Sequence, residues 1–297
     1  MKLCLGTVQF GMDYGIYNQS KKDPEYCLKC FDYATQNGIT AIDTATAYGI
    51  AEQITGEFLA KKTVSREKLF ISTKLLPNIL DDYNPDKYVQ IIRENIQQSL
   101  KTLNTEYIDA YLLHSSRYAF CPEILEALQE IKKEGLTKHV GVSVYYPDEA
   151  MACLESSYVD YMQAPYSLFD HRMKETGIFE KIAERQVMMD IRTVFTKGLI
   201  RLDVDKVPEY LSRAKSLLEK LDNLCKKTGY SRIELAMGYV KSEEDINHLV
   251  FGVRDLGQLK EDILAFEKDI PEDVIEEIEK AFSNVDADIV IPSLWKK

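Results

Sequence analysis

Four side chains that can hold charge or transfer protons lie at or just after the ends of short apolar segments. Asp43 closes one such segment, and Tyr48 follows five residues later in a loop of small residues. Lys74 and His114 close two further apolar segments. If these segments are parallel strands of a barrel, their carboxyl ends converge on one face. The sequence therefore predicts that a carboxylate, a phenol, an ammonium and an imidazole meet in one pocket.

These residue types are suited to one kind of chemistry. An isolated tyrosine is a weak acid with a pKa of about 10, and a nearby ammonium lowers that pKa because it stabilises the phenolate. We expect Lys74 to have this effect on Tyr48, with Asp43 holding Lys74 in position. His114 could then orient a carbonyl oxygen or relay a proton. Such a group can protonate a carbonyl oxygen while hydride arrives at the carbonyl carbon.

Other chemistries have weaker support. No nucleophile elbow is present, and His114 has no partner at metal-ligand spacing, so we expect no metal site. Cys27 and Cys30 form a C-x-x-C pair, but they lie in a predicted helix and no second pair follows. A barrel lyase or isomerase with Lys74 as a Schiff-base nucleophile remains an alternative, although a paired, charged lysine is the better interpretation.

Eight short apolar segments alternate with helical patterns along the chain. The predicted strands cover 2–7, 38–43, 69–73, 108–113, 138–143, 158–163, 186–191 and 248–251. The predicted helices cover 24–37, 51–61, 85–103, 122–134, 147–155, 175–185, 207–227, 231–241, 256–267 and 271–283. This alternation predicts an α/β fold, a (β/α)8 TIM barrel of eight parallel strands with an extra C-terminal helix. An open doubly wound sheet is the runner-up, but no G-x-G-x-x-G follows the first strand.

Composition narrows the class of protein. The 297 residues carry a formal net charge of −11, which disfavours a nucleic-acid partner. No apolar run reaches membrane-spanning length, and the first residues lack the pattern of a signal peptide. The six scattered cysteines are typical of reduced thiols, so we expect a cytoplasmic protein. No linker divides the chain, and residues 1–297 are predicted to form one domain. The sequence does not indicate its oligomeric state.

Taken together, the motifs resemble those of the aldo-keto reductases from residue 5 to about residue 263. The matching segments are D-T-A at 43–45 with Y-G at 48–49 and Glu52, S-T-K at 72–74, L-L-H at 112–114, G-V-S at 141–143, Gln163 with Y-S-L at 166–168, G-L-I at 198–200, and 252–262. The resemblance implies a barrel that binds a nicotinamide dinucleotide, usually NADPH with NADH possible, without a Rossmann fold. It also implies reduction of a small aldehyde or ketone, which could be a sugar or keto-sugar.

The resemblance also implies roles for individual residues. Tyr48 would be the general acid, Lys74 its pKa-lowering partner, Asp43 the partner of Lys74, and His114 the group that orients the substrate. The residues expected to contact the dinucleotide are Gly6, Thr7, Ser143, Gln163, Arg192, Gly198, Gly252, Arg254, Gln258, Glu261 and Asp262. Among these, Ser143 and Gln163 would bind the nicotinamide carboxamide, and the segment from 251 onwards would face the adenosine.

Several positions depart from the family pattern. Val144 stands where an Asn commonly binds the carboxamide, and Arg192 stands where a Tyr commonly stacks on the nicotinamide. A planar guanidinium can also stack on a ring. Asp262 replaces an adenine-binding Asn, and Gln258 replaces an Arg that binds the 2′-phosphate. Arg254 is either a substitute phosphate ligand or a solvated residue at a helix start, so the choice between NADPH and NADH stays open.

Two further features could border the pocket. Aromatic residues fall in predicted loops near the mouth, at Tyr14, Tyr17, Tyr145, Tyr146, Tyr166 and Phe169. The apolar tail 289–297 holds the one Trp of the chain and should dock, either across the mouth or along the outer helices. A second functional hypothesis is a regulatory or redox-sensing subunit that binds cofactor with little turnover.

Overall fold

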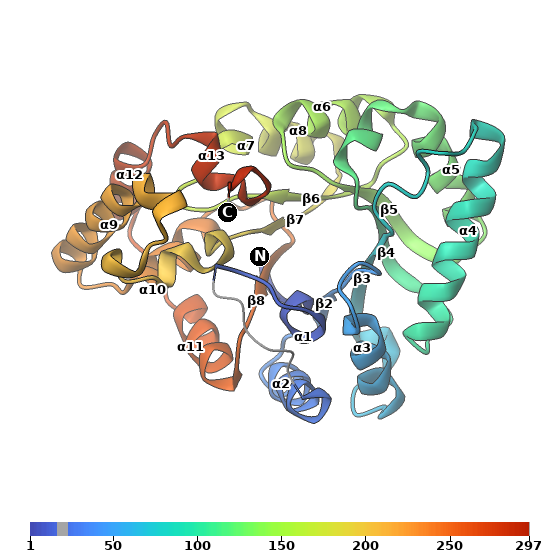
Figure 1. Cartoon of the computed structure of the whole chain (residues 1–297), viewed down its shortest axis with the longest axis horizontal. Coiled ribbons are helices and arrows are strands. Elements are labelled where there is room, and N and C mark those ends of the chain that lie inside the picture. Colours follow the sequence, from blue (N-terminus) through green and yellow to red (C-terminus); the bar gives the residue numbers. More distant parts are fainter. Residues whose placement is uncertain (17–22, 297) are drawn as a thin grey trace.

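A computed structural model describes residues 1–16 and 23–296 of the chain. Within these ranges, eight parallel strands close into one barrel in sequence order (Figure 1). The strands are β1 (Lys2–Gly6), β2 (Ala41–Asp43), β3 (Phe70–Leu75), β4 (Ile108–Leu113), β5 (Thr137–Ser143), β6 (Tyr161–Pro165), β7 (Met188–Arg192) and β8 (His248–Gly252). Pairing of β8 with β1 completes the ring. The predicted (β/α)8 barrel is confirmed, and the doubly wound alternative is wrong.

Helices surround the barrel and cover its outer surface (Figure 1). The α-helices are α1 (Val8–Gly11), α2 (Pro24–Gln36), α3 (Ala51–Ala60), α4 (Pro85–Thr102), α5 (Pro122–Lys133), α6 (Pro147–Ser156), α7 (Arg172–Glu175), α8 (Ile178–Arg185), α9 (Lys215–Thr228), α10 (Arg232–Lys241), α11 (Leu256–Glu267), α12 (Glu272–Ala281) and α13 (Ala287–Val290). Short 3-10 turns are η1 (Arg66–Lys68), η2 (Ser116–Phe120), η3 (Thr196–Arg201), η4 (Val204–Lys206), η5 (Glu209–Ala214) and η6 (Pro292–Leu294). The predicted extra C-terminal helix is α12. No helix in the described part of the chain is long and apolar enough to cross a bilayer.

Local sequence signals explain where the helices begin. Asp23 caps α2 by accepting a hydrogen bond from the backbone N–H of Glu25, and Pro24 occupies the first helical position. Ser231 and Glu234 form a capping box at the start of α10, in which each side chain accepts from the other's backbone N–H. The side chain of Asp255 accepts from the N–H of Gln258 at the start of α11. That cap orients α11 beside the end of β8.

Two predicted helices are interrupted. The segment predicted as 175–185 forms the short α7, and then Gly177 at φ 70° breaks the chain direction before α8 begins. Glycine adopts this left-handed conformation without the steric cost that a Cβ brings. The segment predicted as 207–227 starts as η5, in which Leu211 is non-helical, and becomes α-helical at Lys215. Both breaks lie outside the barrel, so neither moves the strand ends.

The interior of the barrel is filled differently at its two ends. Side chains two apart along each strand face inward. Towards the amino-terminal end, the interior holds Asp190, which accepts hydrogen bonds from the Tyr161 hydroxyl and contacts His248 Nδ1 at 2.8 Å. Towards the carboxyl end, Gly6 of β1 is paired with Gly252 of β8. Because glycines present no side chain there, the wall formed by β1 and β8 leaves space at the mouth.

Candidate active site

Alternation along the strands brings the sequence-predicted polar residues to the carboxyl end of the barrel. Gly6 is in register with Asp43, and Ser143 is in register with Gln163. Lys74 on β3 faces the same interior, since its ammonium reaches Asp43. These positions were predicted as strand ends, and the closed barrel brings them to one face as expected.

A buried ion pair lies at the centre of this face. The Lys74 ammonium donates to Asp43 Oδ1 at 2.7 Å and to the Thr44 carbonyl at 2.9 Å. Asp43 Oδ1 also accepts from the Ser72 hydroxyl at 3.0 Å and from the Gln163 amide at 2.8 Å. Lys74 is fully buried and Asp43 is 3% exposed. With its ammonium bonded to two acceptors inside the barrel, Lys74 is held as a paired cation, which argues against the Schiff-base alternative.

Tyr48 and His114 lie next to this ion pair. The Lys74 ammonium is 5.0 Å from the centroid of the Tyr48 ring, and the His114 ring meets the Tyr48 ring edge-on at 5.6 Å. The Nδ1 atom of His114 is buried and has no hydrogen-bond partner among the described residues. The four side chains named from the sequence therefore form one cluster.

The electrostatics of Tyr48 differ from the expectation. Burial raises the pKa of the Tyr48 phenol well above its usual value, and the charge of Asp43 raises it further, while Arg192 opposes the shift. The predicted lowering of this pKa is wrong, because burial and the charge of Asp43 outweigh the positive charges nearby. A raised pKa keeps the phenol protonated, which is the form that can donate a proton.

His114 is held in its neutral form. Burial lowers its pKa to about 3, and the positive charges of Lys74 and Arg192 act in the same direction. Near neutral pH the ring therefore carries one N–H donor and one acceptor nitrogen. A neutral imidazole beside Tyr48 can donate a hydrogen bond to a substrate oxygen, but it is not a cationic acid.

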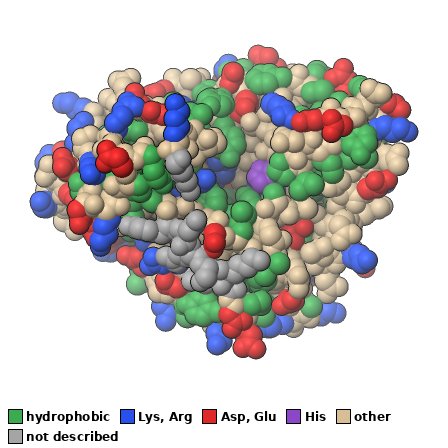
Figure 2. All heavy atoms as spheres, viewed as in Figure 1, with side chains coloured by type: hydrophobic (Ala, Val, Ile, Leu, Met, Phe, Trp, Pro, Cys, Tyr) green, Lys and Arg blue, Asp and Glu red, His purple; other side chains and the backbone are tan. Residues whose placement is uncertain are grey.

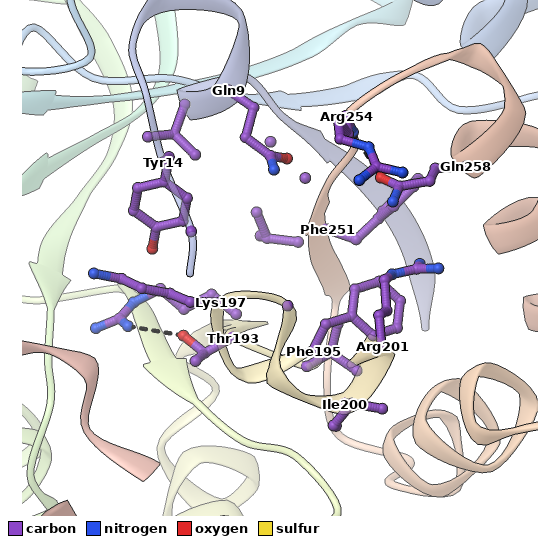
Figure 3. A pocket seen from close by; sticks show the side chains of 18 of the residues that line it. Gln9, Tyr14, Thr193, Phe195, Lys197, Ile200, Arg201, Phe251, Arg254 and Gln258 are labelled. Carbon is purple, nitrogen blue, oxygen red and sulfur yellow. Dashed lines mark hydrogen bonds between the residues drawn. The ribbon is translucent and has the colours of Figure 1, made fainter. Parts of the chain in front are cut away.

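A cavity of about 600 Å³ opens beside this cluster and extends towards β8 and α11. Tyr14, Thr193 and Lys197 lie at one side of it, and Arg201, Arg254 and Gln258 lie at the opposite side (Figure 3). Near the centre of the corresponding face, basic side chains and a histidine are visible close together in a depression (Figure 2). This volume suits a small-molecule or cofactor site.

Most of the predicted cofactor residues line this cavity. The lining includes Gly6, Gln163, Arg192, Gly198, Gly252, Arg254, Gln258 and Glu261, together with Asp43 and Tyr48. Three predicted residues, Thr7, Ser143 and Asp262, are buried and do not line it. The Thr7 hydroxyl instead donates to the Asp43 carbonyl at 3.0 Å, which ties β1 to the end of β2.

The Arg192 side chain is held by contacts within the protein and is not free to stack on both faces. Its guanidinium lies over the Tyr145 ring at 4.2 Å from the centroid. Nη2 donates to the Val144 carbonyl at 2.7 Å, and Nη1 donates to the Thr193 hydroxyl at 3.2 Å. One face of the guanidinium is therefore already covered by an aromatic ring of the protein.

Arg201 is a residue of the cavity that the sequence reasoning missed. It donates to Glu261 at 2.8 Å and to Asp262, and its guanidinium lies 4.2 Å from the centroid of the Phe195 ring. Burial raises the pKa of Asp262 to about 7, against the opposing effect of Arg201. The second carboxylate oxygen of Asp262 has no partner in the described residues. Nothing in the local sequence pattern of η3 indicated this contact.

The loop from β7 into η3 is strained where it borders the cavity. Thr193, Thr196 and Lys197 all have positive φ, at 70°, 47° and 52°. For β-branched residues this conformation is a rare outlier, and such residues cost on the order of 1–3 kcal/mol each. The Thr196 hydroxyl oxygen is also buried without a partner in the described chain. Backbone strain and an unmet hydrogen bond therefore coincide in the loop that borders the cavity.

Comparison with known proteins identifies the family. Residues 2–282 match the Aldo/keto reductase family. The chain belongs to this family. Its members are oxidoreductases that act on carbonyl compounds, so this barrel is an oxidoreductase of that kind.

Two relatives and one solved structure illustrate the aldo-keto reductase match. The NADH-specific methylglyoxal reductase of Escherichia coli is 26% identical over 82% of this chain and 83% of its own length. The aldo-keto reductase YhdN of Bacillus subtilis is 26% identical over 80% of this chain and 78% of its own. The holo form of aldo-keto reductase AKR11C1 from Bacillus halodurans superposes with a TM-score of 0.76. It shares 25% identity and covers 94% of this chain and 91% of its own.

The aromatic residues and the C-terminal tail were also expected at the mouth of this aldo-keto reductase, and only some of these residues line the cavity. Tyr14 lines the cavity, whereas Tyr145 contacts it only through Arg192. Of the other aromatics, Tyr146, Tyr166 and Phe169 do not line it, and Tyr17 lies outside the described residues. In the tail, residues 289–291 are buried, and the Trp295 ring lies 6.0 Å from the Lys197 ammonium. The described part of the tail, residues 289–296, thus borders the cavity through Lys197 and does not itself line it.

Proposed function

We propose that this aldo-keto reductase uses NADPH or NADH to reduce an aldehyde or ketone, with a small carbonyl compound or sugar as substrate. The observation that carries the proposal is the cluster of Tyr48, His114 and the Asp43–Lys74 pair, of which Tyr48 and Asp43 line one end of a single cavity and His114 and Lys74 lie directly behind them. Basic side chains at its other end suit the phosphates of a dinucleotide. The residues needed for proton donation and for cofactor binding are therefore in one continuous space.

The residues of the cavity fit a nicotinamide dinucleotide. Gln163 donates to Asp43, which leaves its buried carbonyl oxygen without a partner in the described residues, and that oxygen can accept from a carboxamide N–H. At Gly252 an added Cβ would lie 2.8 Å from Gln9 Oε1, so glycine leaves room there without a movement of the Gln9 side chain. Arg254 and Arg201 would face the phosphate-bearing end. When bound, the reduced nicotinamide supplies a hydride.

The side chains of the protein then supply the proton and the polarisation. Neutral His114 donates a hydrogen bond to the carbonyl oxygen and holds it beside the Tyr48 hydroxyl. As hydride reaches the carbonyl carbon, negative charge develops on the oxygen, and Tyr48 transfers its proton there to give the alcohol. Lys74 stabilises the phenolate that remains, and Asp43 fixes the position of Lys74.

The test is a reduction assay with purified protein, NADPH or NADH, and a panel of aldehydes and keto-sugars. Oxidation of the cofactor is followed by absorbance, and cofactor binding is measured separately by intrinsic fluorescence. We expect turnover that is lost in Tyr48→Phe. Cofactor binding without turnover of any carbonyl would contradict the proposal and favour the regulatory or redox-sensing role.

A further inference from the structure

Around Tyr48, the positively charged side chains outnumber the negatively charged ones. Lys74 and Asp43 form a compensated pair at 2.7 Å, and His114 is neutral because burial lowers its pKa to about 3. Arg192 remains. Within the described residues it forms no ion pair with a carboxylate, and it donates hydrogen bonds to the Val144 carbonyl and the Thr193 hydroxyl.

The Arg192 guanidinium also has unused hydrogen-bonding capacity. Arginine carries five N–H donors, and the two hydrogen bonds just described use one donor on each terminal nitrogen. Nε is buried and unpartnered among the described residues. Because the side chain lines the same cavity as Tyr48 and Tyr14, its charge is felt at both phenols. Arg192 is half-buried, so a cation with unused N–H donors lines the cavity beside the reaction centre and is suited to an anionic partner.

Basic side chains outnumber acidic ones along the rest of the cavity wall as well. Among its described lining residues five are basic, namely Arg192, Lys197, Arg201, Arg232 and Arg254, and two are acidic, namely Asp43 and Glu261. The whole chain carries a formal net charge of −11. Arg201, Arg232 and Arg254 each pair with a carboxylate. No such ion pair of Arg192 is found among the described residues, so Arg192 can attract an anion. The basic side chains near β8 and α11 suit the dinucleotide phosphates, but Arg192 lies at the other end, beside Tyr48.

We infer that Arg192 recognises an anionic group on the substrate, so that the preferred substrate is an aldehyde or ketone that also carries a carboxylate or phosphate. This inference rests on the proposed reductase function and adds the substrate class to it. Tyr145 holds the guanidinium in one plane, with the ring over one face. The N–H groups left on the two terminal nitrogens are then held in fixed positions, which suits the paired oxygens of such a group.

The experiment compares matched substrates that differ in charge. The specificity constant kcat/KM is measured for 4-formylbenzoate and for 4-methylbenzaldehyde, which have similar shapes. A second pair, glyceraldehyde 3-phosphate and glyceraldehyde, distinguishes phosphate from carboxylate recognition. We expect the wild-type protein to prefer the anionic member of at least one pair by about tenfold to a hundredfold, the range for a charge-assisted hydrogen bond in a desolvated site.

Variants then assign the preference to Arg192. Arg192→Gln should remove most of the anionic-to-neutral ratio, and Arg192→Lys should keep part of it because it keeps the charge. The ratio cancels any effect on cofactor binding, since both substrates use the same loaded enzyme. Arg185→Gln is the matched control, because Arg185 is exposed at the end of α8, away from the cavity, and makes the same change in net charge. It should leave the ratio at its wild-type value.

The outcomes separate this inference from the proposed function. Turnover with equal constants for charged and neutral substrates, or a ratio unchanged in Arg192→Gln, overturns the anion site and leaves the reductase function standing. If no carbonyl is turned over, calorimetric binding of 4-methylbenzoate to wild type but not to Arg192→Gln supports the anion site and overturns the reductase. Absence of both turnover and anion binding overturns both.

Discussion

Removing the buried ammonium of Lys74 should destabilise the protein measurably. In Lys74→Met the side chain keeps much of its apolar length, but Asp43 loses its charged partner inside the barrel, where it is 3% exposed. Breaking one side of a buried ion pair costs about 3–5 kcal/mol of unfolding free energy, because the remaining charge is uncompensated. Asp43 still accepts from Ser72 and Gln163, so we expect the lower end, about 3 kcal/mol.

The magnitude converts to a melting temperature. For a domain larger than 150 residues each kcal/mol corresponds to roughly 2 °C, so Lys74→Met should lower Tm by roughly 6 °C in calorimetry at pH 7.5. The control is Lys133→Met. Lys133 pairs with Glu130 at 2.6 Å, close to the 2.7 Å of the buried pair, but the two side chains are 68% and 45% exposed. An exposed pair contributes about 0–1 kcal/mol, so this variant should melt near the wild-type temperature.

A second substitution tests the cause. Adding Asp43→Asn to Lys74→Met removes the uncompensated charge, so the double variant should be more stable than the single variant. Loss of packing or of the hydrogen bond to the Thr44 carbonyl would not be repaired in this way. A double variant that melts lower than Lys74→Met, or a single variant that melts with wild type, would refute the electrostatic reasoning.

Three further outcomes follow from the site. Tyr48→Phe should lower kcat by about 10²–10⁴-fold, the usual contribution of a general acid, with dinucleotide affinity retained in a fluorescence titration; near-normal kcat would remove Tyr48 as the proton donor. The pKa of His114 is lowered to about 3, so the imidazole stays neutral from pH 5 to 8. The pH profile of kcat/KM should therefore show no ionisation near pH 6.5 that is present in the wild type and absent in His114→Gln. The pKa of Asp262 is raised to about 7 from an unfolded value of about 3.9. Between these two pKa values the folded protein binds a proton that the unfolded chain does not. The free energy of unfolding therefore falls as pH rises through this range. The Tm of Asp262→Asn minus that of the wild type should therefore rise between pH 5 and pH 8. A difference in Tm that does not change with pH would contradict this.

The fold and the cluster at the mouth could be predicted because they depend on short-range regularities. Alternating strand and helix patterns specify the barrel, and period-two alternation within a strand specifies which side chains face inward. Asp43, Lys74 and Gln163 satisfy both conditions, so their meeting follows once the ring closes. The geometry adds that one carboxylate oxygen accepts from all three donors around it, Ser72 included.

The remaining contacts depend on loops and on long-range packing. Arg201 lies in an irregular 3-10 turn, and its acidic partners are 60 and 61 residues away. Positive φ at Thr193 and Thr196 has no sequence signature, since β-branched residues avoid that conformation. The pKa of Tyr48 was predicted in the wrong direction because the sequence shows the nearby Lys74 but not the burial that dominates the shift.

The position of the cavity follows from which strands lack side chains at the mouth. Gly6 and Gly252 lie side by side on β1 and β8, whereas the opposite wall carries Leu112 and the ring of His114. The open space therefore extends from Tyr48 across β1 and β8 towards α11, and not along the barrel axis, where the amino-terminal half is filled by Tyr161 and other buried side chains. A long ligand that enters this space must place one end beside Tyr48 and the other beside α11, and Arg192 then lies at the substrate end. Substitution of Gly252 by alanine would place a Cβ 2.8 Å from Gln9 Oε1, so the end of the Gln9 side chain would have to move to keep the passage open.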